Sequence, residues 1–304
     1  MPLRLPTGHG AILAVAIVAS SMAGWSWPAI AGASAGPTDS GALLAGSFVG
    51  EVAAASTGPV QAAQPYRPPE PPDAAPAPPG TAPLGMYITN AEPLPACSYG
   101  NIPTPLESPG DWALTLMDTT YALTASYVPP DLVPVSEAGV RSAEPLRSLV
   151  IPDLRRMAAA AAAAGAPISI ASGYRSFHNQ SVTFRHWENL QGRAAALISS
   201  ARPGHSEHQL GTAMDFKARG GADPWTYADW AVQTAAGKWL VANAWKYGFI
   251  MSYPRGQTAK TCYEYEPWHY RYVGVAEAAA VHSSGLVLRQ WLWEHQPNPE
   301  VPSP

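Results

Sequence analysis

The chain has 304 residues, a charged fraction of 13% and a formal net charge of −4, with a pI near 6.0. This length allows one or two domains. The slightly acidic balance provides no basic surface of the kind that binds nucleic acid, so we expect no nucleic-acid partner. The 33 prolines and 26 glycines are unevenly distributed, which favours a single folded domain.

Residues 1–35 have the features of an export signal or N-terminal anchor. Arg4 provides a positive charge, residues 11–23 form an uncharged apolar run, and small residues at 29–31 and 33–35 suit a cleavage site. The apolar run is shorter than the roughly 20 residues that a membrane span needs. We therefore expect an exported protein in the cell wall, the medium or a periplasm-like space. An uncleaved membrane anchor and a misassigned start codon are the alternatives.

Residues 36–95 consist mainly of Ala, Pro, Gly and Ser. Such a segment cannot form helix or sheet and samples extended, polyproline-like conformers. It is expected to be a disordered linker that spaces a domain from the membrane or crosses a wall layer, or else a tail without a spacing role. Residues 96–295 are long enough for one core, and residues 296–304 form a polar, proline-rich tail.

Within residues 96–295 the apolar spacing predicts alternating helices and short strands. Helices are expected at residues 112–125, 141–164, 177–200, 225–247 and 275–295. Gly165 is expected to end the second of these, which is rich in alanine. Strands are expected at residues 167–171, 213–216, 249–252 and 268–272. Helices that precede and surround a few strands indicate an α+β fold class.

Two histidines and two acidic residues suggest a catalytic zinc centre: His208, Asp215, Glu266 and His269. Three of them could hold a metal and leave a fourth position open for water, while a nearby carboxylate moves protons. A single His/Asp pair or a single ExxH pattern is more often structural. Their joint occurrence in an exported chain favours a metallohydrolase.

The local sequence suggests how these side chains could meet. Gly211 favours a loop that leads into a strand, so Asp215 could point back toward a metal held by His208. Pro267 excludes an ordinary helix interior between Glu266 and His269. His269 could then bind the metal from the start of a strand, with Glu266 placed to reach a water.

Four segments together resemble the D-alanyl-D-alanine carboxypeptidases of the VanY type, a family of zinc D,D-peptidases. They are SGYRS at 172–176, GHSEHQLGTAMD at 204–215, YGFI at 247–250 and EPWHYRYVG at 266–274. Their order and approximate spacing also match, and the resemblance spans residues 127–293. It implies a small antiparallel sheet packed with helices, the fold shared by zinc D,D-peptidases, lysostaphin-type enzymes and the hedgehog signalling domain.

The resemblance implies a role for each matching residue. Zn²⁺ would be bound by His208, Asp215 and His269, and Glu266 would be the general base. Arg175 would steady the substrate or the developing oxyanion. The positions at which family members contact the peptide correspond to Ser206 and Gln180.

The chain departs from the family pattern at Cys262, which replaces the usual glycine between Thr261 and Tyr263. Cys97 is the other cysteine, and a pair at opposite ends of an exported domain suggests one disulfide. Two unrelated free thiols are the alternative. A zinc-binding role is disfavoured because neither cysteine has a CxxC partner. The bridge would also tether the segment that leads to Glu266.

Further aromatic and histidine residues lie near these motifs. His205 occupies no ligand position, and we expect it behind a ligand or at the surface. Trp268, Tyr270 and Tyr272 alternate along a strand and are expected to pack into the core on one face.

The expected activity is zinc-dependent removal of the terminal D-Ala from peptidoglycan stem peptides during cell-wall remodelling. Zinc would lower the pKa of a water, Glu266 would accept its proton and pass it to the leaving amine, and Arg175 would supply a fixed positive charge. The alternatives are an L,D-carboxypeptidase, a peptidoglycan endopeptidase, a phage-type lysis enzyme and a non-catalytic cell-wall-binding module. Intact Glu266 and intact ligands favour a catalyst.

Overall fold

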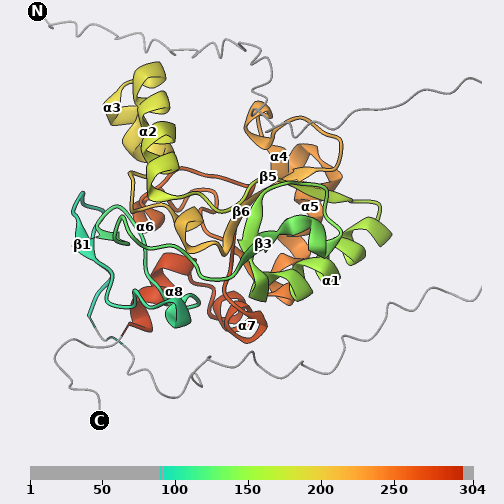
Figure 1. Cartoon of the computed structure of the whole chain (residues 1–304), viewed down its shortest axis with the longest axis horizontal. Coiled ribbons are helices and arrows are strands. Elements are labelled where there is room, and N and C mark those ends of the chain that lie inside the picture. Colours follow the sequence, from blue (N-terminus) through green and yellow to red (C-terminus); the bar gives the residue numbers. More distant parts are fainter. Residues whose placement is uncertain (1–89, 91, 297–304) are drawn as a thin grey trace, which may run out of the picture. The chain divides into compact units, whose positions relative to one another are not determined.

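A computed structural model describes residue 90 and residues 92–296 (Figure 1). The expected signal sequence at residues 1–35 and most of the expected linker lie outside the described residues, as does nearly all of the tail. Within the described part of the chain, no helix has both the length and the apolar character needed to cross a membrane.

The centre of the fold is a four-stranded antiparallel sheet, which confirms the α+β class. Its strands, in spatial order, are β5 (Ile168–Ser172), β6 (Ala213–Ala218), β8 (His269–Tyr272) and β7 (Phe249–Met251). These are the strands predicted from the sequence, within one or two residues at each end. Two smaller sheets pair β1 (Ile102–Pro103) with β2 (Tyr121–Ala122), and β3 (Leu132–Pro134) with β4 (Pro145–Arg147).

Eight α-helices surround these sheets in the described residues. They are α1 (Ile151–Ala163), α2 (Phe177–Gln191), α3 (Arg193–Ser199), α4 (Trp230–Gln233), α5 (Ala235–Asn243), α6 (Thr258–Thr261), α7 (Val275–Ser284) and α8 (Leu288–Glu294). In Figure 1, α1 and α5 lie against the sheet, whereas α2 and α3 project away from it. Accordingly, α2 buries only Gln180 and Phe184.

Side-chain alternation gives the sheet one apolar face and one polar face. The apolar face packs into the main core and includes Met214, Phe216, Tyr270 and Tyr272. Trp268 packs against the same core from a partly buried position, so the core assignment of the three alternating aromatic residues is confirmed. The intervening residues of β6 and β8 therefore lie on the other face.

The predicted helix at residues 112–125 is wrong. A 3₁₀ turn at Pro109–Asp111 precedes this segment. From residue 112 to the start of β2 the backbone forms no regular helix or strand. Asp118 accepts hydrogen bonds from the backbone N–H groups of Thr120 and Tyr121 at 2.7 and 2.8 Å, and Arg289 donates to its other oxygen at 2.6 Å. Residues 112–119 are all buried. The apolar residues thus line a loop enclosed by the core, and a periodicity argument cannot recognise that arrangement.

Three other predicted helices are shorter or interrupted, and the reasons are local. The helix expected at residues 141–164 starts only at Ile151, because Pro145 begins β4, and it ends before Gly165 as predicted. Gly192 (φ 83°) separates α2 from α3, and Gly285 (φ 69°) separates α7 from α8. A left-handed residue cannot continue an α-helix, and glycine adopts that conformation without steric cost.

The helix expected at residues 225–247 is likewise broken. It consists of the 3₁₀ turn Pro224–Thr226, the short helices α4 and α5, and a further 3₁₀ turn at Ala244–Tyr247. Thr234 separates the two helices by capping α5, since its hydroxyl accepts a hydrogen bond from the N–H of Gly237 at 2.9 Å.

A disulfide joins Cys97 to Cys262 across 165 positions of sequence, as predicted. Cys262 has a φ of 69° and is the only non-glycine residue with positive φ in the described part of the chain. It follows α6 directly and ends that helix. Cys262 therefore adopts a backbone conformation that glycine favours, although it carries a side chain.

This combination predicts different stabilities for two variants that both remove the disulfide. Cys97→Ser loses the cross-link but keeps a side chain at the left-handed position, whereas Cys262→Gly loses the cross-link and relieves the strain. Removal of a native disulfide typically costs about 2–5 kcal/mol, and a left-handed non-glycine residue costs about 1–2 kcal/mol. In chemical denaturation both variants should be less stable than the oxidised wild type, and Cys262→Gly should be the more stable of the two.

Reduced wild-type protein is the control and should unfold like Cys97→Ser. A Cys262→Gly variant that is equally or less stable than Cys97→Ser would show that the left-handed conformation stores no strain.

Candidate metal centre

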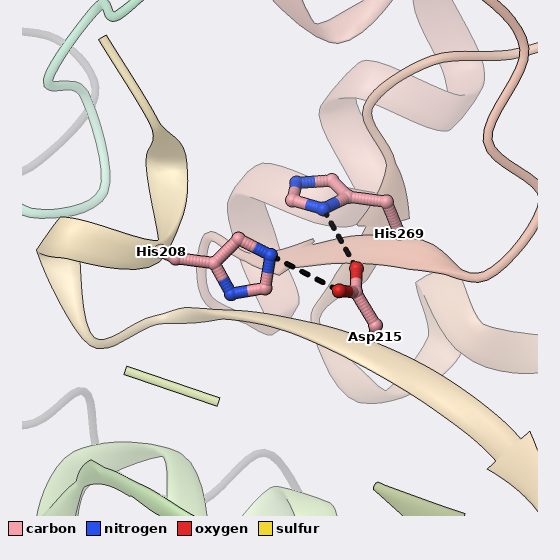
Figure 2. A group of neighbouring side chains, drawn as sticks. All are labelled: His208, Asp215 and His269. Atoms are coloured by element: carbon pink, nitrogen blue, oxygen red, sulfur yellow. Dashed lines mark hydrogen bonds and ion pairs between the residues drawn. The ribbon is translucent and has the colours of Figure 1, made fainter. Parts of the chain in front are cut away.

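Figure 2 shows His208, Asp215 and His269 converging. Asp215 and His269 project from the polar face of the sheet. All three are buried, and one ligand atom from each lies within 4.8 Å of the others. His208 comes from the 3₁₀ turn η5 (Glu207–Leu210), Asp215 from β6 and His269 from the first position of β8. The three predicted ligands are therefore brought together by three separate elements.

The three side chains converge because of the pairing register between β6 and β8 and because Gly211 turns the chain between η5 and β6. Asp215 and His269 are directly paired across β6 and β8, so their side chains project from the same face at neighbouring positions. Gly211 ends η5 with φ 70° and turns the chain into β6. A Cβ at this position would approach Arg147 Cγ to 3.0 Å. The turn therefore requires glycine for its conformation and for its close packing.

Each imidazole is held from behind by a hydrogen bond on one nitrogen and faces Asp215 with the other. His208 Nδ1 lies 2.6 Å from the carbonyl oxygen of Gly173, and its Nε2 lies 3.3 Å from Asp215 Oδ2. His269 Nε2 lies 3.0 Å from Glu207 Oε2, and its Nδ1 lies 3.0 Å from Asp215 Oδ1. Metal-binding histidines are commonly fixed in this way. Two imidazole nitrogens and a carboxylate oxygen are a donor set that suits zinc.

The electrostatics of the cluster favour a cation. Burial lowers the pKa of His208, which therefore stays neutral, as a metal ligand must. Burial alone would raise the pKa of Asp215, but the two histidines lower it well below the usual value. Burial alone would lower the pKa of His269, but its hydrogen bonds with Asp215 and Glu207 raise it to about 10. The two carboxylates thus stabilise positive charge between them.

Glu266 lies at the edge of the cluster and is not one of the three converging ligands. Its Oε2 is 3.9 Å from His269 Nδ1, and its side chain is 21% exposed, so water can reach it. Burial raises its pKa to about 7, against the lowering effect of His269. A carboxylate with a pKa near neutrality is well suited to accept and return a proton.

Arg175 presents a fixed positive charge beside the cluster. It donates to Gln180 Oε1 at 2.8 Å and to Ser172 Oγ at 2.9 Å, and its Nη2 lies 3.8 Å from Asp215 Oδ2. Its side chain is 21% exposed. The guanidinium is therefore held in one orientation and remains accessible to an anionic group.

The predicted peptide-contacting residues lie close to these groups. Gln180 is buried, and besides accepting from Arg175 it donates to the carbonyl oxygen of Ala201 at 2.6 Å. Ser206 is buried and directly precedes η5. Peptide contact by either residue stays a prediction, and the structure shows Gln180 supporting Arg175.

His205 is neither at the surface nor behind a ligand, so that expectation is wrong. It is buried, with Nδ1 2.7 Å from the carbonyl oxygen of Asp118 and Nε2 3.0 Å from Asn101 Oδ1. It therefore fastens the irregular segment before β2 to the loop that precedes η5.

Glu207 is a residue of the site that the sequence analysis missed. It is buried and contacts His269, Arg271 and Ser252. Burial alone would raise its pKa, but the hydrogen bond with His269 and the charge of Arg271 lower it to about 2. Its place beside His208, and the position of Arg271 two residues after His269, were signals in the sequence that could have indicated it.

Several known proteins are similar to this chain in sequence and in fold. A family model described as VanY, D-alanyl-D-alanine carboxypeptidase, matches residues 143–275. The D-alanyl-D-alanine carboxypeptidase of Enterococcus faecalis (strain ATCC 700802 / V583) is 30% identical over 230 residues, which are 68% of this chain and 81% of that protein.

Two solved structures have similar folds. One is the LdcB LD-carboxypeptidase, with a TM-score of 0.56, 32% identity and coverage of 66% of this chain and 100% of that one. The other is a variant of the vancomycin-resistance D,D-pentapeptidase VanY in complex with Zn(II), with a TM-score of 0.50, 32% identity and coverage of 60% and 99%. The chain therefore belongs to the VanY family of D-alanyl-D-alanine carboxypeptidases, whose members are zinc metallopeptidases.

Proposed function

We propose that this protein is a zinc-dependent carboxypeptidase that removes the terminal D-Ala from peptidoglycan stem peptides. The observation that carries the proposal is the convergence of His208, Asp215 and His269, with Glu266 and Arg175 beside them. The VanY relative solved with Zn(II) supports zinc as the metal.

Different residues of the chain would bind the metal and transfer protons during peptide hydrolysis. His208 Nε2, His269 Nδ1 and a carboxylate oxygen of Asp215 would hold zinc, which when bound supplies a Lewis acid for the scissile carbonyl and for a water. Glu266 would accept a proton from the attacking water through its partly exposed carboxylate and donate it to the leaving amine. Burial raises the pKa of Glu266 above the usual value for a glutamate, which suits a group that must both accept and return a proton.

Arg175 would make the site prefer the C-terminal end of a substrate peptide. A carboxypeptidase substrate carries a free carboxylate one residue beyond the bond that is cut. The guanidinium, fixed by Gln180 and Ser172, can bind that carboxylate with charge-assisted hydrogen bonds. An endopeptidase substrate has no such group at that position, so this geometry favours removal of a terminal residue.

An L,D-carboxypeptidase is the second candidate. The similarity to the LdcB LD-carboxypeptidase over the whole of that chain supports it. Such an enzyme would use the same metal centre and the same proton transfers on a tetrapeptide, whose terminal D-residue follows an L-residue.

Defined stem peptides test the proposed activity. The zinc-loaded protein should release D-Ala from a pentapeptide ending in D-Ala-D-Ala, and a chelator should abolish the release. Amidation of the terminal carboxylate should lower kcat/KM by about 10- to 150-fold, since a hydrogen bond to a charged group contributes about 1.5–3 kcal/mol. Mass spectrometry of the products provides the measurement.

Release from a tetrapeptide and not from the pentapeptide would establish the L,D activity in place of the proposed one. If no stem peptide gives a chelator-sensitive product, the chain is not the proposed hydrolase, and a wall-binding role would take its place.

Glu266→Gln separates proton transfer from metal binding. Loss of the general base should lower kcat by about 10²- to 10⁴-fold, while zinc binding persists because Glu266 is not a ligand. Glu264→Gln, an exposed change two residues earlier, is the matched control and should leave both properties unchanged. Steady-state kinetics and metal analysis provide the readouts, and undiminished turnover of the Glu266→Gln enzyme would exclude the assigned role.

We also propose that the protein works outside the cytoplasm, secreted or tethered at its N-terminus. The Cys97–Cys262 disulfide supports this location, because such bridges persist mainly in oxidising compartments. Fractionation of producing cells should place the protein in the wall, membrane or medium fraction with both cysteines protected from alkylation. Recovery in the cytoplasmic fraction with two reactive thiols would refute the proposal.

A further inference from the structure

Glu207 lies behind the metal centre and does not face Asp215. The residue is 4% exposed, and its carboxylate contacts three side chains, two from β8 and one from the loop after β7. Ser252 Oγ, just after β7, donates to Oε2 at 2.6 Å, and His269 Nε2 lies 3.0 Å from the same oxygen. Arg271 Nη1 donates to Oε1 at 3.1 Å.

Arg271 holds the Glu207 carboxylate in a fixed position. Arg271 is fully buried and lies two residues after His269 on the same face of β8. Its Nη2 donates to the carbonyl oxygen of Trp112 at 2.8 Å. A buried guanidinium anchored at both ends holds the Glu207 carboxylate in place and balances its charge. Glu207 therefore cannot rotate toward another partner without depriving the buried Arg271 of its only carboxylate partner among the described residues.

The hydrogen-bond pattern determines which nitrogen of His269 faces the metal site. An ionised carboxylate only accepts hydrogen bonds, so the imidazole nitrogen opposite Glu207 must carry a proton. Nδ1 lies 3.0 Å from Asp215, so the proton on Nδ1 is the one that a metal held by Asp215 would displace, while Nε2 keeps its proton toward Glu207. Tyr253 stacks on the ring with centroids 4.9 Å apart and limits its tilt.

We propose that Glu207 is a positioning residue for the metal centre: by accepting a hydrogen bond from His269 Nε2, it fixes the ring so that Nδ1 binds the metal. The proposal rests on the zinc dependence proposed above. Glu207 directly precedes His208 in η5, so this one short turn carries one metal ligand and orients another. His208 receives the equivalent support from the backbone carbonyl of Gly173, which no side-chain substitution can remove.

Glu207→Gln tests the proposal with little change in volume. An amide has one acceptor oxygen and one NH₂ group, so it must turn the NH₂ toward either Arg271 or His269 Nε2, and both are donors. Loss of a hydrogen-bonding partner behind a metal ligand typically lowers metal affinity by about 10- to 100-fold. Competition with a chromophoric chelator should show a decrease of that size for Zn²⁺.

Ser252→Ala is the matched control, because it removes a different hydrogen bond to the same Glu207 oxygen and leaves the contact with His269 intact. Its loss of zinc affinity should be far smaller than that of Glu207→Gln. Thermal unfolding of the metal-free proteins distinguishes positioning from a general structural role. If Glu207→Gln lowers only the melting temperature and binds Zn²⁺ as tightly as the wild type, the proposal is overturned.

A measurement on the zinc-loaded wild type decides the question even if Glu207→Gln does not fold. With ¹⁵N-labelled histidine, His269 should show a protonated Nε2 whose hydrogen resonates downfield and exchanges slowly with water. A proton on Nδ1, or rapid exchange at Nε2, would overturn the proposal. Failure of the wild type to bind Zn²⁺ would instead refute the proposed function, so the two outcomes are distinguishable.

Discussion

The direct pairing of Asp215 with His269 across β6 and β8 is the constraint on which the rest of the site depends. It places an acidic ligand and an imidazole on the polar face of a sheet whose other face is held by the apolar core. Because side chains alternate, a shift of one residue in this register would turn Asp215 toward Met214's side of the sheet. The core therefore fixes the geometry of the ligands, although it contributes no atom to the metal centre.

Two kinds of residue surround this pair. Some hold the imidazole rings by hydrogen bonds, and others place charged groups at the solvent-accessible edge of the site. The carbonyl of Gly173 and the carboxylate of Glu207 hold the two imidazoles. Arg175, pinned by Gln180, and Glu266, which is partly exposed, lie where a substrate could reach them. The three proposed metal ligands are thus buried, while the residues expected to handle the peptide and the proton keep some contact with solvent.

The sequence was sufficient to predict what depends on local pattern and motif. All four strands of the central sheet, the meeting of His208, Asp215 and His269, and the Cys97–Cys262 pair were predicted, because short apolar strands and a dense motif carry strong signals. The helix expected at residues 112–125 failed because burial of an irregular loop depends on distant partners, such as Arg289 for Asp118. Glu207 was missed for a similar reason, since its role depends on Arg271 and His269 from another strand.

The central claim is that three buried side chains form a zinc site in which each histidine uses a defined nitrogen. A crystal structure of the zinc-loaded protein, with anomalous diffraction measured at the zinc absorption edge, tests it most directly. The account predicts one strong anomalous peak bound by His208 Nε2, an oxygen of Asp215 and His269 Nδ1. A peak bound through His269 Nε2, or located away from Asp215, would contradict it.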